Sequence, residues 1–158
     1  MAAVFFDKEE TTMKVAECMT TDIRTVTPDQ PMAEAARLML DADTGVLPVQ
    51  EGERLVGMIT DRDIAVRGVA ADRGPSEPVR SVMTGDVSTV FEDDDIETVA
   101  LRMSDEQVRR MPVMSRDNRL VGMISVGDLA KSRDSSAADA ALSGIVQPGG
   151  QHDQSRGA

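Results

Sequence analysis

The sequence predicts an α+β fold made of two tandem half-domains, each with the order strand, helix, strand, strand, helix. Three repeated phrases support this fold class. LVGMITDRD at 55–63 returns as LVGMISVGD at 120–128, CMTTDIRTV at 18–26 returns as VMTGDVSTV at 82–90, and LPV at 47–49 returns as MPV at 111–113. The pairs keep one internal order at offsets of 64 or 65 residues. We therefore expect two copies of one unit, packed face to face as a pseudo-two-fold pair.

Each copy is expected to open with a short strand rich in β-branched residues, IRTVT at 23–27 or VSTVF at 87–91. A helix should follow, because Pro28 and Pro31 suit its first turn in copy one and the acidic run Glu92–Asp95 suits the positive end of its dipole in copy two. Each helix has one apolar stripe at helical spacing. The stripes are Met32, Ala35, Ala36 and Met39, and Ile96, Val99, Ala100 and Met103.

The second half of each copy is predicted to be a β-hairpin followed by a helix. The strands VLPVQ at 46–50 and RRMPVM at 109–114 lead through polar turns into the two LVGMI strands. The last helix then begins at a hydroxyl residue, Thr60 or Ser125. One copy, at roughly 55 residues, would bury too little surface to be stable alone, which favours a pair with a shared core.

The remaining segments are assigned from composition. We expect a flexible N-terminal segment at 1–13, repeat one at 14–70, a linker at 71–77, repeat two at 78–132 and a largely disordered tail at 133–158. The tail leaves room for a short helix around Ala137–Leu142. Because it holds few apolar residues, we expect that its removal costs little stability.

Composition excludes several classes of function. The net charge is −11 and the only aromatic residues are 3 phenylalanines, so the chain offers neither a basic patch nor an aromatic platform to nucleic acid. Cys18 and His152 are each the only residue of their type, so no intrachain disulfide is possible, and a zinc site or a Ser/His or Cys/His catalytic pair has almost no material. No run approaches the ~20 apolar residues of a membrane span. We expect a cytoplasmic protein that is not an enzyme, requires no cofactor or metal, and contacts neither nucleic acid nor membrane.

The repeated motifs resemble the tandem CBS-domain family, named after cystathionine β-synthase. The motifs are the Met-Thr pair, the strand with Thr-Val, the LPV and MPV strands, and the ending Gly-apolar-apolar-Thr/Ser-x-x-Asp, which recur in this order between residues 14 and 132. Small stand-alone CBS proteins of the bacterial hypoxic-response type look especially similar. The resemblance implies a disc-like homodimer whose clefts hold AMP, ADP, ATP or another adenosine ligand, and it does not imply an enzyme.

The candidate ligand site lies where the third strand of each copy meets the last helix. Thr60 and Ser125 should stand at a helix N-terminus, which attracts phosphate, and Arg62 would add positive charge in copy one. By resemblance, Asp63 and Asp128 would accept hydrogen bonds from the ribose hydroxyls. Also by resemblance, the backbone enclosing the base would include Thr25, Val26, Thr27, Val46 and Pro48 in copy one, and Thr89, Val90, Arg110 and Pro112 in copy two.

A second interpretation assigns the same four polar residues to helix capping. In the pattern Ser/Thr-x-x-Glu the first side chain caps the helix and the fourth reaches back to the backbone. The segments from Thr60 to Asp63 and from Ser125 to Asp128 fit this pattern with a shorter acid. The hydroxyls can serve both purposes, so both interpretations stay open at this point.

The surroundings of the two candidate sites differ. Copy two has Gly127 where copy one has Arg62, so we expect tighter nucleotide binding in copy one. The acidic run Glu92–Asp95 is interpreted as a solvated helix start, and Arg109 or Arg110 either reaches a phosphate or forms a solvated or dimer-facing salt bridge. Gly57 and Gly122 would allow a ligand or a neighbouring backbone to approach the strand closely.

Two hypotheses of function follow. The leading one is a regulatory module that binds an adenosine nucleotide and signals through an unidentified protein partner. The alternative is a dimeric interaction or stress-response protein whose clefts stay empty.

Overall fold

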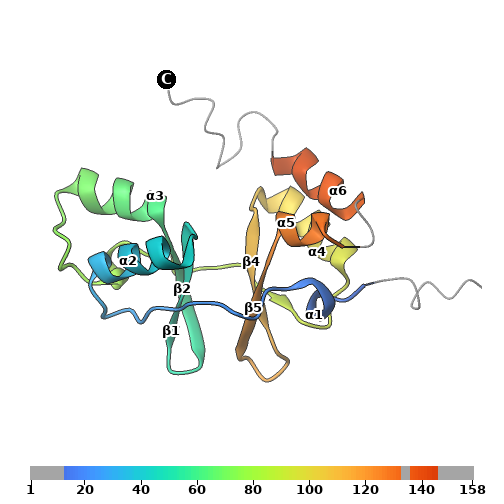
Figure 1. Cartoon of the computed structure of the whole chain (residues 1–158), viewed down its shortest axis with the longest axis horizontal. Coiled ribbons are helices and arrows are strands. Elements are labelled where there is room, and N and C mark those ends of the chain that lie inside the picture. Colours follow the sequence, from blue (N-terminus) through green and yellow to red (C-terminus); the bar gives the residue numbers. More distant parts are fainter. Residues whose placement is uncertain (1–12, 133–135, 146–158) are drawn as a thin grey trace, which may run out of the picture. The chain divides into compact units, whose positions relative to one another are not determined.

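The computed structural model describes residues 13–132 and 136–145, which fall into two compact units (Figure 1). The first-repeat unit comprises Asp22–Thr89 with Asp117–Leu120. The second-repeat unit comprises the described residues up to Thr21, Val90–Arg116 and the described residues from Val121 onward. Helices and strands alternate in both units, so the α+β class and the two-copy organisation are confirmed.

In the first-repeat unit, helix α2 (Met32–Ala42) precedes a hairpin of strand β1 (Val46–Glu51) and strand β2 (Arg54–Thr60), which pair antiparallel. The helical segment after β2 changes its winding twice. It consists of helix α3 (Asp61–Asp63), the π-helix η2 (Ile64–Gly68) and the 3₁₀ helix η3 (Val69–Ala71).

The predicted strand at 23–27 is reduced to one parallel bridge between Val26 and Val49. Val26 N donates to Pro48 O, and Gln50 N donates to Val26 O. The next donor of a parallel ladder would be residue 28. Because Pro28 has no backbone N–H, the ladder ends after this single bridge.

In the second-repeat unit, a three-stranded sheet has the order β3 (Val90–Phe91), β4 (Arg110–Met114), β5 (Leu120–Ser125), and β3 runs parallel to β4. Only the last two residues of the predicted strand at 87–91 belong to β3. Helix α4 (Ile96–Glu106) connects β3 to β4, and helix α5 (Val126–Ala130) follows β5. No helix among the described residues is long and apolar enough to cross a membrane.

The opening segment of repeat one packs in the second-repeat unit. Helix α1 (Val15–Cys18) lies there, and Val15 N donates to Asp94 O. Farther along the segment, Thr20 and Met123 form an antiparallel bridge. These contacts lie between residues about 80 to 100 positions apart, so no local sequence pattern indicates them.

The opening segment of repeat two makes the equivalent exchange. The 3₁₀ helix η4 (Val79–Ser81) lies in the first-repeat unit, and Thr84 forms an antiparallel bridge with Met58 on β2. Val79 N also donates to Gln30 O. Each compact unit therefore consists of most of one repeat and the opening segment of the other.

This exchange also satisfies the first backbone amide of each long helix. Met32 N at the start of α2 donates to Glu77 O at 2.7 Å, and Ile96 N at the start of α4 donates to Met13 O at 3.1 Å. The first N–H groups of a helix have no partner within the helix and are satisfied from outside it. In both units that partner is the carbonyl oxygen of the residue directly before the opening segment of the other repeat, Glu77 for α2 and Met13 for α4.

The two cores are aliphatic and contain residues of the exchanged segments. The first-repeat core is formed by Val26, Met32, Ala35, Met39, Leu47, Val49, Ile59, Val79 and Val82. The second-repeat core is formed by Val15, Val90, Ile96, Val99, Ala100, Met103, Met111, Val113, Ile124, Leu129, Ala137, Ala138 and Ala141. Of the two predicted apolar stripes, only Ala36 departs, because it is exposed.

Within the predicted tail, Ser136–Ile145 form helix α6, which includes the short helix expected around Ala137–Leu142 and extends beyond it at both ends. This helix buries Ala137, Ala138, Ala141 and Ile145, and it packs against α4 and α5. Alanine side chains are small, so their density in the tail looked like low complexity although it allows close helix packing. Residues 133–135 and 146–158 lie outside the described residues, as do residues 1–12 of the predicted flexible N-terminal segment.

Candidate functional site

The first strand–helix junction is a complete capping box at the end of β2. Asp63 N donates to Thr60 Oγ1 at 3.0 Å, and Thr60 N donates to Asp63 Oδ2 at 3.0 Å. Thr60 has extended backbone angles and stands at the N-cap of α3. The two side chains thus satisfy two amides that a helix start would otherwise leave without a partner.

The second junction repeats this geometry at the end of β5. Asp128 N donates to Ser125 Oγ at 3.1 Å, and Ser125 N donates to Asp128 Oδ2 at 2.9 Å. The capping interpretation of these four residues is therefore confirmed in both copies. It accounts for both hydroxyls and for one carboxylate oxygen of each aspartate.

The second carboxylate oxygen of each aspartate makes only a long contact. Asp63 Oδ1 lies 3.9 Å from Arg67 Nε, one turn farther along the chain. Asp128 Oδ1 accepts from Thr20 Oγ1 at 3.4 Å, close to the upper limit for a hydrogen bond. At each junction, Oδ1 of the aspartate is therefore a hydrogen-bond acceptor that the capping box holds in place and that makes no short contact of its own.

The glycines before these junctions allow a neighbouring backbone to approach. A Cβ on Gly57 would lie 2.6 Å from the carbonyl oxygen of Thr84, and a Cβ on Gly122 would lie 2.7 Å from that of Thr20. Real Cβ atoms do not approach backbone oxygen so closely. Of the two interpretations of these glycines, the structure shows the one in which the neighbour is the chain itself.

Thr20 and Thr84 are the residues near the site that sequence reasoning missed. They belong to the Met-Thr pairs, which recur at the same offset of 64 residues. Each pairs with the middle of the strand that ends in the junction, Thr20 with Met123 and Thr84 with Met58. The repeat of Met-Thr was the available signal, but nothing in it indicated that each pair joins the other repeat's strand.

The residues expected around the base in the first-repeat unit lie along β1. Val46 pairs with Thr60 across the hairpin, and Val26 pairs with Val49 on the opposite edge of β1. The side chains of Val26 and Pro48 are buried, and Pro48 O already accepts from Val26 N at 3.1 Å. Thr25 and Thr27 beside them are partly or fully exposed.

The corresponding residues of the second-repeat unit follow the same arrangement. Val90 pairs with Val113 on β4, Thr89 directly precedes it, and Arg110 begins β4. Val90 and Pro112 are buried, whereas Arg110 is exposed. The end of β5 reaches the same region, because Val126 N donates to Arg109 O at 2.9 Å.

The two junctions differ in their charged neighbours. Arg62 is exposed, and within the described residues its guanidinium forms no ion pair, while its backbone N donates to Asp61 Oδ1 at 2.8 Å. Gly127 occupies the matching place in copy two. Arg109 and Arg110 are also exposed and form no ion pair with other described residues.

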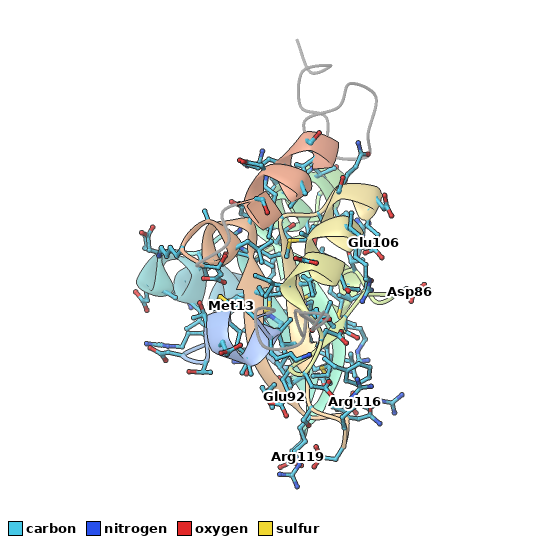
Figure 2. All side chains as sticks on the ribbon, turned by 90° about the vertical axis from the view of Figure 1, so that its right-hand side faces the viewer. Met13, Asp86, Glu92, Glu106, Arg116 and Arg119 are labelled. Atoms are coloured by element: carbon cyan, nitrogen blue, oxygen red, sulfur yellow. The ribbon has the colours of Figure 1, made fainter. Side chains whose placement is uncertain are left out.

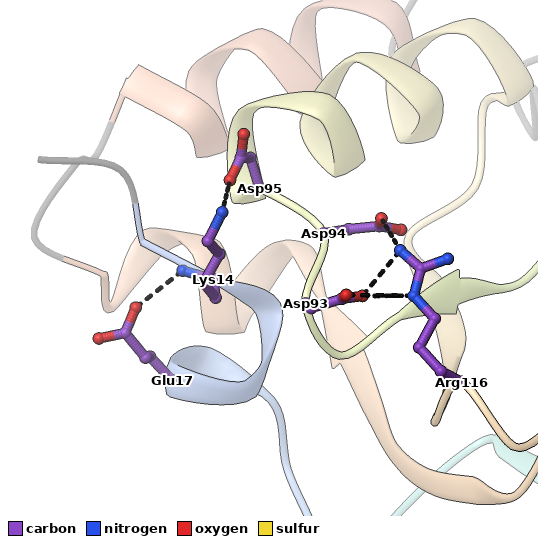
Figure 3. Close-up of polar contacts among 6 residues, drawn as sticks. All are labelled: Lys14, Glu17, Asp93, Asp94, Asp95 and Arg116. Atoms are coloured by element: carbon purple, nitrogen blue, oxygen red, sulfur yellow. Dashed lines mark hydrogen bonds and ion pairs between the residues drawn. The ribbon is translucent and has the colours of Figure 1, made fainter. Parts of the chain in front are cut away.

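The acidic run after β3 has structural partners (Figure 3). Lys14 Nζ lies 2.6 Å from Asp95 Oδ1, which ties α1 to the start of α4. Arg116 lies over the Phe91 ring and pairs with Asp93 at 2.9 Å. The hydrogen bond from Arg116 lowers the pKa of the Asp93 carboxyl below 3.8.

Family comparison supports the repeat structure. The CBS domain model matches residues 15–68 and 79–135. The CBS domain-containing protein YhcV of Bacillus subtilis is 39% identical over 132 residues, which cover 83% of this chain and 94% of YhcV. Hypoxic response protein 1 of Mycobacterium tuberculosis is 33% identical over 117 residues, which cover 73% of this chain and 81% of the relative.

A solved structure has the same fold. The CBS domain pair of protein MJ0100, in complex with 5'-methylthioadenosine and S-adenosyl-L-methionine, superposes with a TM-score of 0.66. It is 27% identical, and the match covers 76% of this chain and 94% of that one.

Proposed function

The chain belongs to the CBS domain family, and on this premise we propose that it is a non-catalytic regulatory module. It binds an adenosine nucleotide at its strand–helix junctions, and the bound state is passed to a protein partner. The lone His152 and the lone Cys18 leave almost no material for a Ser/His or Cys/His catalytic pair. Among the described residues, no group of three His, Cys, Asp or Glu side chains could hold a metal ion.

The observation that carries the proposal is the second oxygen of each junction aspartate. The capping box uses Oδ2 of Asp63 and Asp128 and orients both carboxylates, while Oδ1 keeps only contacts of 3.9 and 3.4 Å. A carboxylate oxygen oriented in this way accepts a hydrogen bond from a hydroxyl without first losing freedom of its own. Ribose hydroxyls are donors of this kind.

The MJ0100 relative supports the class of ligand. Both molecules in that structure, 5'-methylthioadenosine and S-adenosyl-L-methionine, contain an adenosine group. At this chain's first junction, Arg62 adds an exposed cation within two residues of the N-cap. We expect this cation to favour a phosphate-bearing ligand such as AMP.

The test is titration calorimetry with AMP and with S-adenosylmethionine on the wild type and on Asp63→Asn and Asp128→Asn. The asparagine oxygen can still accept from the N-cap amide, so the cap is kept while the second carboxylate oxygen is lost. We expect Asp63→Asn to weaken AMP binding at least tenfold, which corresponds to about 1.4 kcal/mol. Asp128→Asn should change it less, because the junction of copy one is the tighter site.

Two results would contradict the proposal. If Asp128→Asn alone abolished AMP binding, the ranking of the two junctions would be wrong. If the wild type gave neither heat nor a thermal shift with any adenosine ligand, nucleotide binding itself would be wrong.

The alternative function is a dimeric interaction or stress-response protein with empty clefts. Two observations favour it: both capping boxes are complete, and Gly57 and Gly122 contact the backbone of the chain itself. These contacts explain most of the repeated segments 55–63 and 120–128 by structure alone, without a ligand. A null titration, combined with a homodimer in solution, would make it the better account.

A further inference from the structure

Helix α6 packs against the helix that begins at the second junction. It contacts both α4 and α5, and Figure 2 shows it alongside α4, whose C-terminal end is marked by Glu106. Leu129 of α5 is fully buried and belongs to the same core as the buried alanines of α6. Leu129 directly follows Asp128, the capping aspartate of this junction. The packing of α6 therefore reaches the residue next to the candidate ligand acceptor.

A second contact joins α6 to the segment that precedes β4. Gln107 stands at the C-cap of α4 with left-handed backbone angles, and its Nε2 donates to Gly144 O at 3.1 Å. Two residues later, Arg109 O accepts from the N–H of Val126, the first residue of α5, at 2.9 Å. The segment from Gln107 to Arg109 thus connects α6 to the start of α5 by a route that does not pass through Leu129.

A close contact near the C-terminal end of α6 fixes where this helix lies. A Cβ on Gly144 would collide with Ser104 Oγ and would lie 2.5 Å from Ser104 O. This position of α6 therefore requires glycine, and α4 accepts the helix only where Gly144 meets Ser104. If α6 leaves this position, it gives up the hydrogen bond from Gln107 and the contact with Leu129 together.

We propose that the docking of α6 and ligand binding at the second junction are coupled, so that α6 passes on the occupancy of this junction. The inference rests on the nucleotide binding proposed above. The docked helix holds α5 through Leu129 and holds the residues that lead into β4 through Gln107. A ligand that binds Asp128 selects this arrangement. By thermodynamic linkage, the ligand and the docked helix stabilise each other by the same factor.

The first junction provides an internal comparison. The helical segment after its cap packs within the first-repeat unit, where a Cβ on Gly68 would lie 2.6 Å from Met32 Sδ of α2. Helix α6 belongs to the second-repeat unit. We therefore expect ligand binding at Asp63 to be independent of α6.

The first experiment measures AMP affinity by titration calorimetry after α6 has been displaced. Gly144→Leu should lift α6 from α4, and Ser143→Leu is the matched control, because Ser143 is the exposed neighbour on the same helix. Each is combined with Asp63→Asn, which leaves the second junction intact, and with Asp128→Asn, which leaves the first. Gly144→Leu should weaken AMP binding about tenfold beside Asp63→Asn and by less than about twofold beside Asp128→Asn. Ser143→Leu should leave both affinities unchanged.

A milder variant keeps the test valid if Gly144→Leu does not fold. Gln107→Gly removes the hydrogen bond to Gly144, while glycine retains the left-handed C-cap of α4. It should weaken AMP binding at the second junction about threefold, as expected for the loss of one hydrogen bond, and leave the first junction unchanged.

The second experiment measures hydrogen exchange of the α6 amides with and without saturating AMP. AMP should slow this exchange in the wild type and in Asp63→Asn. The factor should match the loss of affinity that displacement of α6 causes, because the coupling is reciprocal. In Asp128→Asn, AMP should leave the exchange of α6 unchanged.

The results distinguish a failure of the coupling from a failure of nucleotide binding. The coupling is wrong, and the proposed function stands, if the wild type binds AMP but α6 exchanges at the same rate or faster. The same conclusion follows if Gly144→Leu weakens both junctions equally, or if Asp63→Asn binds no AMP at all. If the wild type binds no adenosine ligand, the proposed function and the coupling are both wrong.

Discussion

The two strand–helix junctions agree in their caps and differ in their surroundings. The four capping hydrogen bonds measure 3.0 and 3.0 Å at Thr60–Asp63, and 3.1 and 2.9 Å at Ser125–Asp128. Beyond the cap, the first junction continues through a π-helix to a 3₁₀ turn, whereas the second ends after the five residues of α5. Arg62 stands at the first, and Gly127 stands at the second.

This comparison separates what the repeated phrase does in both copies from what each copy does alone. The shared residues build a helix start and a strand that accepts a neighbouring backbone. The residues that differ set the charge and length of the helix that follows. If the junctions bind nucleotide unequally, the cause is therefore expected in the differing residues.

The largest expected effect concerns the shared glycines. Gly57→Ala and Gly122→Ala should each lower the free energy of unfolding by about 1–3 kcal/mol, because the new methyl group would press on a backbone carbonyl that cannot rotate away. Urea unfolding measures the change. Gly85→Ala, which meets open space, should change it by less than about 1 kcal/mol. If only one of the two variants lost stability, the contacts of Gly57 with Thr84 and of Gly122 with Thr20 would not contribute equally to the fold.

The next effect tests the charge difference between the junctions. Given nucleotide binding, Arg62→Gly should weaken AMP binding about tenfold, because it removes a charge-assisted contact to phosphate. Gly127→Arg should strengthen binding at the second junction, and its Cβ would meet Ser125 Oγ at an ordinary 3.5 Å. Calorimetry with AMP on both variants checks this. If the wild type, Arg62→Gly and Gly127→Arg all bound AMP with equal affinity, the cation at this position would not contribute to binding.

A smaller effect concerns the caps. Thr60→Ala and Ser125→Ala should each lower the free energy of unfolding by about 1 kcal/mol, since each removes a hydroxyl that accepts from an N3 amide. The two losses should be similar because the bond lengths are similar. Thermal or urea unfolding measures them. A loss several times larger at one junction would mean that its hydroxyl has a second structural task.

The smallest effect lies at Asp93, outside the junctions. Its pKa in the folded protein is lowered from 3.8 by the hydrogen bond from Arg116. A depressed pKa contributes stability that is present above the unfolded value and is lost as the pH falls through the folded value. Carboxyl NMR titration should therefore show a lowered pKa that returns toward 3.8 in Arg116→Gln. An unchanged pKa in that variant would contradict the assigned cause.

Local features of the fold were determined by the sequence. The starts of α2 and α4, the two hairpins and both capping boxes follow from residues that interact over three or four positions, or over one turn. The candidate site was predictable to the same extent. Thr60, Asp63, Ser125 and Asp128 could be assigned in advance because a capping box is complete within four residues.

Only the tertiary structure decided which segments meet. Thr20 contacts Asp128, and Thr84 contacts Met58, yet no periodicity links these positions. The same applies to Ala36 and Ala100, which occupy equivalent places in two apolar stripes but differ in exposure, because α6 packs on α4 whereas Ala36 on α2 is exposed. The spacing of apolar residues predicts which side chains will be buried, but not which segment will bury them. The partner itself is set by the path of the whole chain, since burial is non-directional and any apolar surface of suitable shape can provide it.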